Sequence, residues 1–99
     1  MLSLKHGVIY FESAKLADRV LVVEERLAVM PDGQISIRLS LVSRKGKQSL
    51  EFRCEFYDDR GASAGSVEGA TLTLRDGRAQ MLTLASRKAA VRYTLFVWN

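Results

Sequence analysis

A regular alternation of aliphatic and polar residues is the feature that most constrains how this chain folds. Between Ile35 and Leu41 every second residue is aliphatic, and the residues between them are Ser36, Arg38 and Ser40. Because successive side chains of a β-strand point to opposite faces, the aliphatic set lies on one face and the polar set on the other. The segment is therefore predicted to be a strand with one buried face.

The same alternation returns after a polar turn at residues 44–48. From Leu50 to Phe56 the apolar residues alternate with Glu51, Arg53 and Glu55. Two such runs joined by a short loop are typical of a β-hairpin. We therefore predict that this second strand is the antiparallel neighbour of the first.

Further strands are predicted on both sides of this pair, over Val8–Phe11, Thr71–Leu74, Ala79–Leu84 and Val91–Trp98. Between the second and third of these, the Asp76-Gly77 pair suits a tight hairpin turn, because both residue types tolerate a positive φ.

Residues 13–30 fit both helical and strand spacing. The β-branched residues Val20, Val22 and Val23, together with a turn at residues 31–33, favour a strand over Val20–Met30. Residues 13–18 are expected to form one helical turn or a loop.

Six or seven strands separated by turns predict an all-β sandwich or a small barrel. A chain of 99 residues is long enough for one hydrophobic core and too short for two. We therefore expect residues 1–99 to form a single antiparallel domain, with residues 1–18 as a loosely ordered N-terminal segment.

The counts of cysteine and histidine exclude several kinds of site. Cys54, the single cysteine, cannot form an internal disulfide, and His6, the single histidine, leaves a structural zinc site short of ligands. Cys54 shares the apolar strand face with Phe52 and Phe56, so we interpret it as an unreactive core residue. His6 is interpreted as a surface residue near a frayed terminus. No catalytic residue, metal or cofactor is predicted, and the chain is not expected to be an enzyme.

No apolar run approaches the roughly 20 residues that a helix needs to cross a bilayer. Residues 1–7 also lack the features of a secretory signal. The protein is therefore expected in the cytoplasm if Met1 is its native start, or it is a mature fragment whose signal lies outside this sequence.

The formal net charge of +4 is spread along the chain, with acidic residues between the basic ones. Arg38, Arg53 and Arg92 would form a basic stripe if their strands were neighbours, and such a stripe beside an aromatic residue binds single-stranded nucleic acid. The interleaved Glu51 and Glu55 favour cross-strand Arg–Glu pairing on a solvated face. An oligonucleotide-binding small β-barrel is therefore the alternative function, and nucleic acid is not the expected partner.

The stretch from Leu50 to Gly61 resembles the most recognisable part of the YcfL-like family, a group of small bacterial envelope lipoproteins of unknown function. That part reads hydrophobic-x-Tyr-x-Phe-x-Trp-Phe/Tyr-Asp-x-x-Gly. This chain has matching residues at Tyr57, Asp58 and Gly61, with Phe52 and Phe56 where the family has tyrosine and tryptophan. The similarity extends over residues 20–99.

The resemblance implies an immunoglobulin-like β-sandwich located in the periplasm or at the outer membrane, and it carries no known activity. It also implies a loop over Ala85–Ala90 before the closing strand. The family's lipobox cysteine has no counterpart, because Cys54 lies in the middle of a strand. A lipid anchor is therefore expected only if an upstream segment is missing.

Asp58 and Asp59 are adjacent carboxylates, which can hold a divalent cation. Calcium takes about six to eight oxygen ligands, and no second acidic cluster supplies them. We interpret the segment as a structural turn in which Asp58 accepts backbone N–H bonds and Gly61 takes a positive φ.

The last strand is apolar on both faces near its end, where Phe96 and Trp98 alternate with Leu95 and Val97. Exposed aromatic residues are typical of interfaces. We therefore predict a non-enzymatic interaction or structural domain that contacts a protein partner or a second copy through Phe96 and Trp98.

Overall fold

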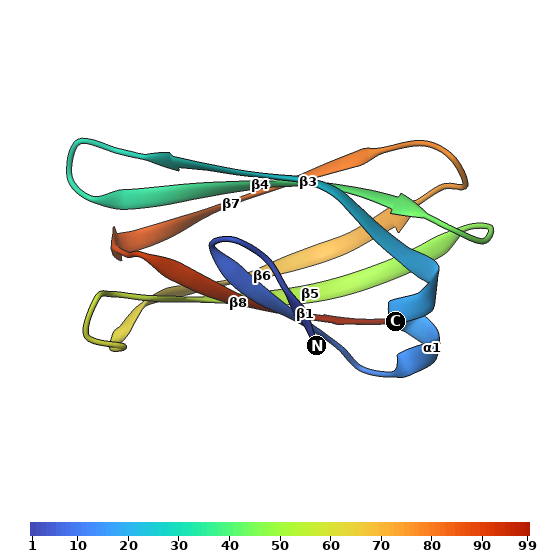
Figure 1. The fold of residues 1–99 in the computed structure, drawn as a ribbon, viewed down its shortest axis with the longest axis horizontal. Coiled ribbons are helices and arrows are strands. Elements are labelled where there is room, and N and C mark those ends of the chain that lie inside the picture. The colour runs from blue at the N-terminus through green and yellow to red at the C-terminus, as the bar shows by residue number, and fades with distance from the viewer.

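The chain folds into two β-sheets that pack face to face (Figure 1). The computed structural model describes the backbone of residues 1–99 and every side chain except that of Ala70. One sheet has the order β1-β2-β8-β5-β6, formed by Leu2–Ser3, Gly7–Phe11, Arg92–Trp98, Gln48–Tyr57 and Ser63–Leu74. The other has the order β3-β4-β7, formed by Val20–Val29, Gln34–Ser43 and Gln80–Ala89. The prediction of an all-β sandwich is confirmed, and the alternative of a barrel is not, because the two sheets remain separate.

The prediction of an antiparallel domain is wrong for one strand pair, because β2 and β8 are parallel neighbours in the larger sheet. A tight turn joins only antiparallel strands, whereas β2 and β8 are connected through most of the chain. Gly7 pairs with Tyr93 and the register continues to Phe11 and Val97, whereas the other strand pairs are antiparallel. The predicted strand over Val20–Met30 is confirmed as β3, which forms a hairpin with β4 and has a β-bulge between Val22 and Glu24.

The predicted hairpin between residues 35–41 and 50–56 is wrong. These residues lie in β4 and β5, which belong to opposite sheets. The connecting turn carries the chain across the sandwich, and its side chains fix it: the Ser43 hydroxyl donates to the Gly46 carbonyl, and Gln48 Nε2 donates to the Lys45 carbonyl over 2.9 Å. The apolar faces of β4 and β5 must both contact the same core. They face one another when the two strands lie in opposite sheets, whereas in a hairpin within one sheet they would point in the same direction.

The second predicted hairpin, around Asp76-Gly77, is also wrong in its pairing. The tight turn does form, with the Arg78 N–H donating to the Arg75 carbonyl over 3.3 Å. Beyond it the strands separate, so that β6 pairs with β5 and β7 pairs with β4. Residues 85–89, expected as part of a loop, continue β7 instead, because residues 83–85 and 89 pair with β4.

The N-terminal segment forms regular secondary structure. It contains β1, β2 and the short helix α1 over Ala14–Arg19, whose first turn is capped by the Ser13 hydroxyl accepting the Leu16 N–H over 3.1 Å. Ile9 and Leu16 are buried in the core. The segment therefore contributes to the packing that holds the sandwich together.

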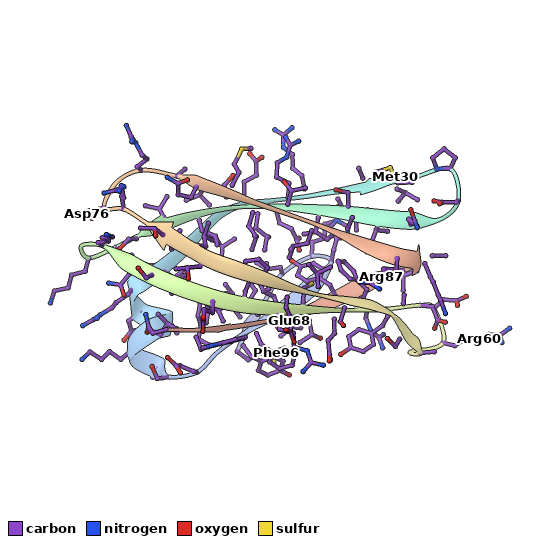
Figure 2. All side chains as sticks on the ribbon, turned by 180° about the vertical axis from the view of Figure 1, so that it is seen from behind. Met30, Arg60, Glu68, Asp76, Arg87 and Phe96 are labelled. Carbon is purple, nitrogen blue, oxygen red and sulfur yellow. The ribbon has the colours of Figure 1, made fainter. Side chains whose placement is uncertain are left out.

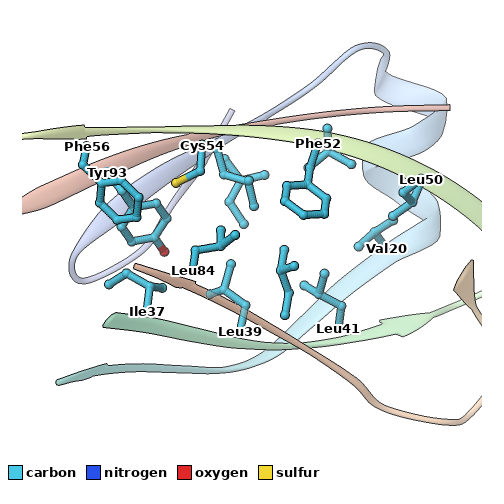
Figure 3. Close-up of a cluster of buried hydrophobic side chains, with 14 of the residues drawn as sticks. Val20, Ile37, Leu39, Leu41, Leu50, Phe52, Cys54, Phe56, Leu84 and Tyr93 are labelled. Carbon is cyan, nitrogen blue, oxygen red and sulfur yellow. The ribbon is translucent and has the colours of Figure 1, made fainter. Parts of the chain in front are cut away.

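Between the sheets lies a single cluster of buried side chains (Figure 3). β5 contributes Leu50, Phe52, Cys54 and Phe56 from one side, and β4 contributes Ile37, Leu39 and Leu41 from the other. Cys54 has no exposed surface. Burial, followed by the nearby Glu55 carboxylate, raises the pKa of its thiol from 9.0 to about 12.

A polar link joins the two layers at one edge of this core. The hydroxyl of the buried Tyr93 on β8 donates to Glu25 Oε2 on β3 over 2.5 Å, and the backbone N–H of His6 donates to Glu25 Oε1 over 3.3 Å. Gly7 is required beside it, because a Cβ there would lie 2.5 Å from the Tyr93 ring. Burial, and then the bond to Glu25, raise the pKa of Tyr93 above its usual value.

In the described part of the chain, no helix combines the length and the apolar character needed to cross a membrane.

Substituting Cys54→Ser should destabilise the fold by about 1–3 kcal/mol, because a hydroxyl in apolar packing has no partner for its hydrogen bond. Urea unfolding at neutral pH measures the change in the free energy of unfolding. The variant Cys54→Ala, which has no hydroxyl, separates the cost of the buried hydroxyl from that of the smaller side-chain volume. The native thiol should resist a thiol reagent until the protein unfolds. Rapid labelling of the folded protein would contradict the strand register, since a slip of one residue exchanges the two faces.

Stability should fall as the pH rises above about 9. The unfolded chain loses the Cys54 and Tyr93 protons near 9.0 and 10.0, whereas the folded state retains them to higher pH, so the stabilisation is complete below pH 9 and is lost above it. Each group contributes a slope of at most about 1.4 kcal/mol per pH unit. Urea unfolding between pH 7 and 11 should show that the free energy of unfolding falls less steeply with pH for Tyr93→Phe than for the wild-type protein. If the pH dependence of Tyr93→Phe equals that of the wild-type protein, the loss of stability at alkaline pH comes from the unfolded state and not from this site.

Candidate functional site

Three aromatic side chains gather on the outer surface of the five-stranded sheet, and we call this group the aromatic face. Phe96 and Trp98 alternate with the buried Leu95 and Val97 on β8, so they point away from the core. Tyr10 is the partner of Phe96 on the parallel strand β2. In Figure 2 the Phe96 side chain extends from the outer surface of the larger sheet. The sequence-predicted pair therefore lies together and gains a third aromatic residue.

The geometry of the aromatic face is fixed by one stack and one hydrogen bond. The Tyr10 and Phe96 rings stack with centroids 5.5 Å apart and planes inclined by 15°. Trp98 Nε1 donates to Glu51 Oε2 on β5 over 2.7 Å. Tyr10 is 43% exposed, whereas Phe96 and Trp98 are half-buried. A shallow hollow of about 230 Å³ lies between these side chains.

Tyr10 was not among the residues predicted from the sequence, although a signal was present. In the predicted strand Val8–Phe11, Tyr10 follows the aliphatic Ile9 and so lies on the opposite face. What the pattern does not contain is the pairing of this strand with the last one, which brings Tyr10 beside Phe96.

The arginines do not form a basic stripe. Arg53 and Arg92 lie on the larger sheet, while Arg38 lies on β4 of the smaller one, opposite Arg26 and Thr83. Arg53 pairs with Glu55 over 2.6 Å, and the Arg92 guanidinium lies 5.6 Å from the centre of the Tyr57 ring. With the arginines on separate sheets and no closed barrel, the oligonucleotide-binding alternative is not favoured.

Asp58 and Gly61 form the turn between β5 and β6. Asp58 Oδ1 accepts the backbone N–H groups of Arg60 and Ala62, each over 2.9 Å, and Gly61 has a φ of 83°. The two N–H groups, that of Ala62 first, lower the pKa of the Asp58 carboxyl. Within the described residues, no group of three or more His, Cys, Asp or Glu side chains could hold a metal ion.

A groove of about 490 Å³ opens at one end of the sandwich, and we call it the end groove. It is lined by residues from four segments that are distant in sequence, each a connection with or without the adjoining strand ends: His6, Leu27, Val29, Gly33, Ile35, Asp58, Asp59, Ala89, Ala90 and Val91. This volume lies within the range of small-molecule and cofactor sites. Asp58 and Asp59 were predicted to lie in a turn and His6 near the terminus, but no local pattern indicates that these segments meet.

Comparisons with known proteins show similarity at the level of structure. No protein-family model and no curated protein matches the chain. The crystal structure of Campylobacter jejuni cj0090 superimposes with a TM-score of 0.72 at 13% identity, over 96% of this chain and 98% of that one. At this identity the match shows a shared fold.

The second similar structure is a DUF1425 family member from Shewanella sp. pv-4. It superimposes with a TM-score of 0.62 at 25% identity, over 79% of this chain and 75% of that one. Neither name states an activity, and neither match confirms the resemblance to the YcfL-like family. The chain therefore shares its fold with two bacterial proteins and is similar to a DUF1425 family member over most of its length.

Proposed function

We propose that this protein is a non-enzymatic interaction domain that uses the aromatic face to bind another protein, a second copy of itself being the first partner to test. One observation carries the proposal. A solvent-facing sheet surface presents Tyr10, Phe96 and Trp98 side by side, with Tyr10 43% exposed. Outward positions of a solvated sheet are usually polar, so adjacent aromatic rings there call for a reason beyond folding.

The surroundings of these rings suit an interface. Tyrosine and tryptophan are enriched among the residues that dominate binding energy, and charged residues are typical of an interface rim. Glu51, which accepts the Trp98 N–H, and Arg53, which lies opposite Phe96, supply such a rim. The stack of Tyr10 on Phe96 holds the rings in place, so that binding would order little that is mobile.

The groups that could support catalysis have other roles in the described part of the chain. The Cys54 thiol is buried and its pKa is raised, which disfavours the nucleophilic thiolate. Glu25 accepts hydrogen bonds from Tyr93 and His6, and Asp58 accepts those of its own turn. These assignments support a binding role over a chemical one.

We further propose an envelope location, in the periplasm or at the outer membrane. One observation supports it: the residue pattern from Leu50 to Gly61 resembles that of the YcfL-like envelope lipoproteins.

The wild-type protein should associate with itself in a concentration-dependent way. Trp98→Ala should weaken that association by about tenfold or more, because truncating an aromatic residue that anchors an interface costs about 2 kcal/mol or more. Sedimentation velocity from about 10 to 500 µM measures this. Met81→Ala removes an exposed apolar side chain from the other sheet and should leave the association unchanged. A wild-type protein that stays monomeric at every concentration would reject self-association.

Expressed from its own gene in its native bacterium, the protein should fractionate with the periplasm or the outer membrane. Reading the gene upstream of the Met1 codon adds a sharper test, since an in-frame signal ending in a lipobox cysteine would predict palmitate labelling. Recovery of the protein in the cytoplasm alone would show that the envelope proposal is wrong.

A further inference from the structure

The end groove lies at the opposite end of β8 from the aromatic face. β8 begins at Arg92, directly after the groove residues Ala90 and Val91, and ends at Trp98. In Figure 2 the labels Met30, Arg87 and Arg60 mark the end of the sandwich that carries the groove, and Asp76 marks the other end. The groove is therefore a separate surface from the one used in the proposed function.

The inner side of the groove is held rigidly between the two sheets. The Ala90 N–H donates to the Gly33 carbonyl in the β3–β4 turn over 3.1 Å, and the Val91 N–H donates to the Tyr57 carbonyl at the end of β5 over 2.9 Å. The segment between β7 and β8 is thus bonded to both layers. A groove with such a fixed segment is preformed and requires little ordering when a ligand binds.

The walls of the groove are apolar, with Ile35 and Ala90 buried at its base and other aliphatic side chains exposed. Leu27, Val29 and Ile35 line it from the smaller sheet, with Ala89, Ala90 and Val91 beside them. Val29 is 68% exposed and Val91 is 52% exposed, and Met30 beside Val29 is 41% exposed. Large aliphatic side chains left in solvent around a concave surface are typical of a binding site for another apolar group.

The charged side chains that line the groove are two carboxylates, although Arg60 in the same turn and Arg87 lie at the same end of the sandwich. Asp58 and Asp59 are the charged residues among those that line it, and no lysine or arginine is among them in the described part of the chain. The Asp58 carboxylate is held in place by two backbone N–H groups, and its lowered pKa keeps it anionic at neutral pH.

We infer that the end groove binds an extended segment of a partner protein in which an aliphatic side chain is followed by a lysine or an arginine. The aliphatic side chain would pack between Val29 and Val91, and the cation would lie against the Asp58–Asp59 turn. A carboxylate in place of the cation would face like charges, so the groove selects by charge as well as by apolar contact.

The test uses the full chain, labelled with ¹⁵N, and three short capped peptides. The first has the sequence Leu-Val-Lys, the second replaces the lysine with glutamate, and the third replaces both aliphatic residues with glycine. Only the first peptide should shift the amide signals of Gly33, Ala90 and Val91, with a dissociation constant on the order of 1 mM. Added salt should weaken the binding of this peptide. Val29→Gln should weaken binding about fivefold or more, and its high exposure means that the fold tolerates the change.

A matched pair of variants isolates the charge. Asp59→Asn should weaken binding of the lysine peptide about threefold, as expected for one exposed ion pair, whereas Asp76→Asn makes the same change in charge at the other end of the sandwich and should have no effect. Equal binding of the glutamate peptide, an equal effect of the two variants, or no shifts at several millimolar peptide would each overturn the inference. Shifts confined to Tyr10, Phe96 and Trp98 would also overturn it while supporting the aromatic face as the binding surface.

Discussion

The burial of two strand faces against one another is the constraint on which the rest of this structure depends. Each long strand presents an apolar face that must leave water, and the only apolar surface large enough to cover one sheet is the inner face of the other. This requirement directs the chain across the sandwich after β4 and again after β6. It also determines which residues face outward, because the two neighbours of an inward-pointing side chain point to the opposite face of the sheet. Both candidate binding surfaces follow from this division.

Much of the fold could be predicted from the sequence because strand periodicity is a local property. The strands around Ile37, Cys54 and Leu95 follow from alternation alone, and the buried position of Cys54 follows with them. The β6 segment from Ser63 to Gly69 could not be predicted in this way. It is rich in small residues with weak strand preference, and its extended conformation depends on pairing with β5.

The pairing of strands was harder to predict, because alternation does not encode which sheet a strand joins. A tight turn such as that at Asp76-Gly77 serves a hairpin and a crossing connection equally well. The same reason explains the candidate sites. Phe96 and Trp98 could be found because they share one strand, whereas Tyr10 joins them through a contact across most of the chain. The end groove combines His6, Gly33, Asp58 and Val91, whose proximity exists only in the folded chain.

The parallel ladder between β2 and β8 has a mechanical consequence. These strands lie near the two ends of the chain and run side by side over five register pairs, from Gly7 with Tyr93 to Phe11 with Val97. Glu12 extends the ladder, donating its N–H to the Val97 carbonyl over 3.0 Å. Because the strands are parallel, tension applied to the two termini pulls them in opposite directions along their length. The hydrogen bonds are then loaded together in shear instead of opening one after another, which makes this pair a clamp against extension of the domain.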